Sequence, residues 1–331
     1  MNEDMTRRGF AGLVAGGAAA AAMGGAMVGT AGGAWVPADG VEVASKGVRS
    51  VASLKRTLRK AVMIGMVAEG KTLAEKCEIV REAGFEGMEI DSPTGLDLDE
   101  LKAGADKVGL VLHGAVNSTH WSVPLNVPDE TAAAKALGSL ETCLRDAKKV
   151  GASSILLVPG VVNADLAYDE CWTRSVGLIR RAMPLAKELG VVIAIENVWN
   201  GFLLSPLEAA RYVDEFADPI VRWHFDIGNV INFGWPEQWV RVLGSRIAKL
   251  HIKDFSRKKR DNEGLWKGFA VEVGEGDAGW ARVMAALDEC GSSGRVPWCG
   301  PGIHRRVRCP PQPGARPARR EGRTGCRRCA S

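Results

Sequence analysis

Short apolar runs alternate along this chain with segments in which apolar residues recur every three or four positions. The runs at 61–67, 85–90, 109–116, 153–158, 191–195, 220–226 and 247–252 are typical of strands buried on both faces. The periodic segments at 72–84, 98–108, 129–150, 169–189, 205–216, 236–243 and 277–290 predict amphipathic helices. Seven repeats of strand then helix indicate an α/β fold, and we expect a (β/α)₈ TIM barrel.

One feature of the sequence supports the barrel, and another qualifies it. An open doubly wound sheet would usually carry a Gly-rich phosphate turn after its first strand, and residues 65–70 do not form one. The barrel expected over residues 60–290 lacks a recognisable eighth strand, because Pro297 lies where a backbone donor is needed and no periodicity follows it. We therefore expect the eighth strand and helix to be missing, or replaced by an aberrant C-terminal tail.

The tail, residues 291–331, differs sharply in composition from the rest of the chain. It contains ten Arg and one acidic residue, a net charge of +9, so residues 1–290 carry −5 within the total of +4. A disordered basic tail that binds acidic surfaces is one interpretation. We favour a shifted reading frame near Gly291, since Arg, Pro, Gly and Cys are abundant when GC-rich coding sequence is read out of frame.

The N-terminus has the order of an export signal. Arg7 and Arg8 precede Phe10 and an uncharged Ala/Gly-rich run, which resembles a twin-arginine-type signal over residues 1–34. A membrane anchor is the alternative, but Ala and Gly are weakly hydrophobic and we expect no stable membrane span. Residues 35–59 form a linker in this interpretation, and the protein is expected to be exported to the periplasm.

Polar residues end three successive predicted strands at Glu196, Asp226 and His251. The carboxyl ends of barrel strands converge on one mouth, so these three side chains are expected to meet there. Each of them alone would more often be a salt-bridge partner, a helix cap or a satisfied core residue. Together they suit a divalent ion, and we expect Mn²⁺, with Mg²⁺, Co²⁺ or Zn²⁺ as alternatives.

The motifs around these positions carry a family resemblance. The segments 195–197 (IEN), 224–229 (HFDIGN), 251–254 (HIKD) and 274–277 (GEGD) resemble the xylose isomerase-like TIM barrels, within them the sugar phosphate isomerase/epimerase group that includes ketose 3-epimerases. The resemblance implies a metal held by Glu, Asp, His and a final Glu, of which the first three correspond to Glu196, Asp226 and His251.

The resemblance also implies substrate contacts. Arg257 falls where epimerases place a substrate-binding Arg, although it also belongs to a basic run that could be a solvated face. Asn229 stands where many relatives carry a substrate-contacting His, which leaves the sugar specificity open. His113 and Trp121 are further candidates for the substrate pocket, with core packing as the alternative for both.

In the epimerase branch, two metal-bound Glu residues on opposite sides of the substrate exchange the proton. Glu196 corresponds to one, and the tail offers no counterpart on strand eight, so we expect a metal-dependent isomerase or epimerase of a sugar or sugar derivative that is impaired in this chain. An inactive sugar-binding protein is the alternative.

An endonuclease IV-like nuclease would need more His ligands and a basic face, which five His and a body charge of −5 disfavour. We expect a small-molecule sugar as partner, no nucleic acid, and leave a homo-oligomer open.

The shifted-frame interpretation predicts a specific nucleotide-level result. Reading the coding sequence in an alternative frame from about Gly291 should give an apolar strand that ends in Glu. Sequencing the gene and translating both other frames tests this, and the interpretation is wrong if neither frame gives such a strand.

Overall fold

The computed structural model describes residues 58–290 and 298–301. The expected signal segment, nearly all of the expected linker and most of the tail lie outside the described residues. Within the described part, no helix is both long enough and apolar enough to cross a membrane.

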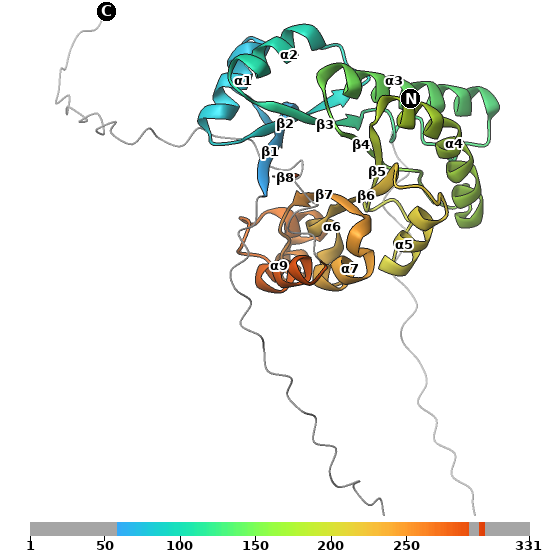
Figure 1. Cartoon of the computed structure of the whole chain (residues 1–331). Helices are drawn as coiled ribbons and strands as arrows, with labels where there is room; N and C mark the ends of the chain where they lie inside the picture. Colours follow the sequence, from blue (N-terminus) through green and yellow to red (C-terminus); the bar gives the residue numbers. More distant parts are fainter. Residues whose placement is uncertain (1–57, 291–297, 302–331) are drawn as a thin grey trace, which may run out of the picture. The chain divides into compact units, whose positions relative to one another are not determined.

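Eight parallel strands close into a barrel with helices around it (Figure 1). The order around the barrel follows the order in the chain, so each strand pairs with its sequence neighbours and β8 returns to β1. The strands are β1 (Arg59–Met63), β2 (Gly87–Ser92), β3 (Val111–Asn117), β4 (Ser154–Leu157), β5 (Val192–Glu196), β6 (Val221–Asp226), β7 (Ile247–Ile252) and β8 (Trp298–Pro301). The predicted (β/α)₈ barrel is confirmed.

The helices connect successive strands. They are α1 (Leu73–Glu82), α2 (Leu98–Lys107), α3 (Glu130–Val150), α4 (Tyr168–Leu189), α5 (Pro206–Asp214), α6 (Ile227–Ile231), α7 (Pro236–Leu243), α8 (Arg257–Glu263) and α9 (Trp280–Glu289). Short 3₁₀ turns occupy Ile64–Met66, Gly244–Arg246 and Leu265–Phe269. The sequence pattern missed α6 and α8, because both are too short to show a helical period and α8 is polar throughout.

The eighth strand matches the second of the two expected alternatives, replacement by the C-terminal tail. Trp298–Pro301, which belongs to the tail, pairs in parallel with β7 and with β1. The tail therefore replaces the strand, and the barrel is closed. The four residues of this strand are enough to pair with both neighbours.

Local sequence signals explain where the helices begin and end. Thr72 and Ser205 form capping boxes with the glutamates three residues on, and Asp97 and Asp129 accept from free N–H groups of α2 and α3. Gly151 and Gly190 end the two longest helices with positive φ angles of 80° and 67°.

Alternation along β6 shows how the barrel separates its two faces. Trp223 and Phe225 are fully buried, and Phe225 stacks on Trp239 of α7. His224 and Asp226 occupy the intervening positions and therefore point to the opposite face, which is the barrel interior. Barrel interiors are mostly filled by branched apolar side chains. Polar residues at these positions are therefore unusual.

The capping box of α1 gives a stability prediction. Thr72→Ala removes the acceptor for the Glu75 backbone N–H, and should lower the free energy of unfolding by about 1 kcal/mol. Urea denaturation of the full chain measures this loss. Thr72→Ser keeps the hydroxyl oxygen and should retain most of the stability, so an equal loss in both variants would contradict the capping role.

Candidate active site

The candidate site lies at the carboxyl ends of β5, β6 and β7. Glu196 is the last residue of β5 and Asp226 the last of β6, and parallel register places Asp226 beside His251 of β7. The three side chains are almost completely buried, and one ligand atom from each lies within 4.8 Å of the others. The expectation that the three meet at the barrel mouth is correct in its geometry.

His251 is the central residue of this group. Its Nδ1 donates to Glu196 Oε1 at 2.7 Å and lies 3.6 Å from Asp226 Oδ2. Burial would lower the pKa of the His251 imidazole, but the surrounding carboxylates outweigh it and raise that pKa well above its usual value. The surrounding carboxylates therefore favour the protonated imidazole.

Asp226 uses its two carboxylate oxygens for different purposes. Oδ1 accepts from the backbone N–H of Asn229 at 2.9 Å and so caps α6. Oδ2 forms an ion pair with Lys253 Nζ at 2.6 Å. Burial would raise the pKa of Asp226, but Lys253 and His251 hold it below its usual range, so this carboxyl stays ionised. Burial raises the pKa of Glu196, and His251 offsets this only in part.

Asn197 fixes the two carboxylate-bearing strand ends relative to each other. Its Nδ2 donates to the carbonyl of Asp226 at 2.7 Å, and its Oδ1 accepts from the backbone N–H of the same residue at 2.9 Å. In return, Asn229 donates from its side chain to the carbonyl of Asn197 at 2.9 Å. These buried bonds continue the β5–β6 pairing beyond the last strand residues and hold the spacing of Glu196 and Asp226.

The donor set fits a divalent cation. Two carboxylates and one imidazole suit Mn²⁺, Mg²⁺, Co²⁺ or Zn²⁺, and the observed separations are within the span of ligands around one ion. The ion pair of Lys253 with Asp226 independently shows that the site attracts positive charge. An ion bound by Asp226 Oδ2 would take the place of that ammonium.

A pocket of about 270 Å³ opens beside Glu196 and has mostly apolar walls. Several aromatic rings form these walls, with a few polar groups between them: its lining residues are Val116, His120, Trp121, Leu156, Glu196, Val198, Trp199, Asn229, Lys253, Trp266 and Phe269. Trp121 is about half exposed and Trp266 about two-thirds exposed. The ring centroid of Trp199 lies 5.0 Å from that of Trp266 and 5.2 Å from that of Phe269. Such a wall suits a ligand with an apolar face and polar edges.

The other residues expected to contact substrate lie in different places. Trp121 and Asn229 line the pocket, as just described. His113 does not line it; it is buried inside the barrel, where Lys249 donates to its Nδ1 at 2.9 Å. Arg257 does not line it either, since its guanidinium donates to the carbonyl of Gly234 and lies over the ring of Trp235.

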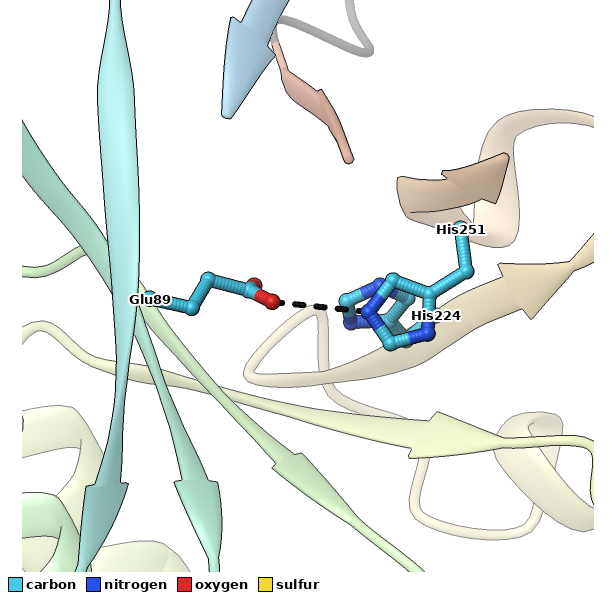
Figure 2. Close-up of side chains that lie close together, drawn as sticks. All are labelled: Glu89, His224 and His251. Atoms are coloured by element: carbon cyan, nitrogen blue, oxygen red, sulfur yellow. Dashed lines mark hydrogen bonds and ion pairs between the residues drawn. The ribbon is translucent and has the colours of Figure 1, made fainter. Parts of the chain in front are cut away.

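A second polar group lies on the interior side of His251. Glu89 of β2 accepts from His251 Nε2 at 3.4 Å, and the ring of His224 lies next to that of His251, with centroids 4.1 Å apart (Figure 2). His113 Nε2 is 3.7 Å from the other oxygen of Glu89. Gly114 leaves room for this group, because a Cβ there would lie 2.8 Å from Glu89 Oε1 and 2.9 Å from Lys249 Nζ.

Sequence reasoning assigned no role to His224 or Lys249, although a signal for both was present. His224 and Lys249 each precede a predicted ligand by two residues, and period-two alternation places such residues on the same face of the strand. No comparable signal indicates Trp199 and Trp266, because only the folded loops bring these two rings together.

Comparisons with known proteins support the barrel fold. The family model described as xylose isomerase-like TIM barrel matches residues 77–319. A 2-epi-5-epi-valiolone 7-phosphate 2-epimerase from Actinoplanes sp. is 27% identical over 135 residues, which is 40% of this chain and less than half, 45%, of that relative.

Solved structures share the fold. A 3-keto-D-glucoside 4-epimerase from E. coli superimposes with a TM-score of 0.63 at 17% identity, covering 76% of this chain and 93% of that one. A D-allulose 3-epimerase from Methylomonas sp. gives a TM-score of 0.59 at 19% identity, covering 74% and 84%.

Lys249 makes the stability of the barrel depend on pH. Burial lowers the pKa of its ammonium to about 8, below the value near 10.5 expected for an unfolded chain, so the unfolded state binds more protons between these values. Stability should therefore rise with pH in this window. The free energy of unfolding, measured by urea denaturation, should rise from pH 7 to pH 9.5. This rise should be about 2 kcal/mol larger for the natural chain than for Lys249→Met.

Lys107→Met is the matched control for this measurement, because Lys107 is exposed and pairs only at the surface with Glu78. It should keep the pH dependence of the natural chain. The same pH dependence in Lys249→Met would show that the buried ammonium is not responsible.

Proposed function

Because the chain belongs to the family of xylose isomerase-like TIM barrels, we propose that it is an isomerase or epimerase of a sugar or sugar derivative that uses a divalent metal ion. The observation that supports this most directly is the meeting of Glu196, Asp226 and His251 beside an aromatic-walled pocket. The epimerases among the similar proteins support the same reaction class.

The pocket supports a sugar as substrate. The exposed indole faces of Trp121 and Trp266 can pack against the C–H face of a sugar, and Asn229 and Lys253 supply polar groups for its hydroxyls. Lys253 is the one Lys or Arg among the lining residues and is already paired with Asp226. A pocket with so little free positive charge favours an unphosphorylated sugar.

Glu196 is the proposed proton carrier. It combines a position on the pocket wall with a pKa raised by burial, which suits a carboxylate that accepts a proton from carbon and returns it. Lys253 stabilises the negative charge that develops on the substrate oxygen. A metal held by Glu196, Asp226 and His251 would supply further electrostatic stabilisation of that charge.

Among the residues that the structure describes, the site offers one proposed proton carrier, where an epimerase of the related branch has two. The sequence of β8, Trp-Cys-Gly-Pro, contains no carboxylate, and its Gly300 is the register partner of His251. A single carboxylate can remove and return a proton only on one face of the substrate. Inversion at one carbon needs a donor on the opposite face, so we propose that epimerisation is impaired while proton exchange on the Glu196 face remains.

A sugar-binding protein without catalysis is the second candidate, and the absence of a carboxylate from β8 is the observation that favours it.

We also propose that the protein is exported to the periplasm, on the basis of the paired arginines near its N-terminus.

Deuterium exchange tests the proposed chemistry. The Mn²⁺-loaded protein in D₂O should introduce one deuterium at the carbon next to the carbonyl of a free ketose such as D-allulose or of a 3-keto-glucoside, as detected by NMR. Glu196→Gln should lower the exchange rate by about 10³-fold, because an amide cannot carry the proton. Glu237→Gln alters another buried glutamate, one paired with Arg282 away from the pocket, and should leave the rate unchanged.

Sugar binding without deuterium incorporation in the Mn²⁺-loaded natural chain would support the binding protein instead. Equal exchange rates in the natural chain and Glu196→Gln would contradict the role of Glu196. If the alternative reading frame restores a strand-eight Glu, that form should epimerise the same sugar.

A further inference from the structure

The interior group below the pocket contains a second set of metal-ligand atoms. Glu89, His224 and His251 come from β2, β6 and β7, and one donor atom from each lies within 4.8 Å of the other two. Figure 2 shows the Glu89 carboxylate approaching the two imidazoles from across the barrel. None of the three lines the pocket, whereas Glu196 of the mouth set does.

His224 is the residue that points to a ligand. It is 1% exposed, and among the described residues neither its Nδ1 nor its Nε2 has a hydrogen-bond partner. Leaving a buried polar group without a partner costs about 1–3 kcal/mol, and buried imidazoles are normally satisfied. The ring of His251, another imidazole, lies 4.1 Å away between centroids at a tilt of 56°, and it satisfies neither nitrogen.

Glu89 gives the set its negative charge. The carboxylate is 6% exposed and contacts two imidazoles, His251 at 3.4 Å and His113 at 3.7 Å. Lys249 is the nearby ammonium, but it donates to the side chain and carbonyl of His113 and forms no ion pair with Glu89 within 4 Å among the described contacts. The carboxylate is therefore open to a cation on the side of His224.

We propose that Glu89, His224 and His251 form a second divalent-cation position inside the barrel, distinct from the one formed by Glu196, Asp226 and His251. Two imidazoles and one carboxylate suit Zn²⁺ or Co²⁺, whereas the two carboxylates at the mouth make a harder set. Among the described residues, the single carboxylate of the inner set, Glu89, forms no ion pair with an ammonium within 4 Å, unlike Asp226 with Lys253.

The two positions compete for one residue. His251 directs Nδ1 to Glu196 and Nε2 to Glu89, and a neutral imidazole has one lone pair for one ion. We therefore expect one ion per chain when both sets are intact. An ion in the inner position stabilises the barrel without serving the reaction. The amount of bound metal therefore does not follow the activity. This inference stands independently of the proposed function, because it depends only on the inner donors.

Cobalt titration of the full chain distinguishes the two positions. Metal-free protein is titrated with Co²⁺ alone, and binding is followed by calorimetry and by the visible absorption of the bound ion. The double variant Glu196→Gln/Asp226→Asn disables the mouth set only, and we expect it to bind one Co²⁺ per chain, still with visible absorption. Adding His224→Phe should weaken this binding by about 100-fold or more, since a direct ligand is lost.

Controls separate ligation from damage to the fold. His224→Asn offers a smaller replacement that should weaken Co²⁺ binding equally, Glu237→Gln should leave it unchanged, and circular dichroism confirms that each variant is folded. The proposal is overturned if the folded double variant binds no Co²⁺. It is equally overturned if Glu89→Gln weakens binding while both His224 variants do not, because Glu89 then only orients His251.

Discussion

The hydrogen bonds between Asn197 and the backbone of Asp226 set the geometry on which the mouth of the barrel depends. They extend the pairing of β5 and β6 past the last ladder residues, where side chains rather than backbone must hold the chain. With the strand ends fixed, Asp226 can direct one oxygen to the first turn of α6 and the other to Lys253. The position of each charge at the mouth follows from this constraint.

His251 connects the mouth to the interior. Its two ring nitrogens face carboxylates on opposite sides, Glu196 toward the pocket and Glu89 toward the barrel interior. Polar groups so deep in a barrel are costly unless they satisfy one another, and most of these do. Among the described residues, His224 is a buried histidine with no hydrogen bond at either ring nitrogen, and this is what makes the inner group more than a structural network.

Barrel closure and catalytic completeness are separate properties in this chain. Backbone pairing by four residues is enough to join β7 to β1, whatever side chains those residues carry. In the mechanism that we propose, proton transfer on both faces of a substrate needs a carboxylate on β8, and the sequence of this strand contains none. The tail completes the fold, and the missing carboxylate is the basis of the impairment that we propose.

The sequence by itself determined the barrel and the group of Glu196, Asp226 and His251, because strand and helix periods are local properties and polar residues at the ends of consecutive parallel strands must converge. It also contained the alternation that puts His224 and Lys249 inside. Only the tertiary structure decided which nitrogen of His251 meets which carboxylate, that His113 lies in the interior rather than on the pocket wall, and that Arg257 turns to Gly234. Contacts between strands on opposite sides of a barrel depend on its closure and stagger, which no single segment encodes.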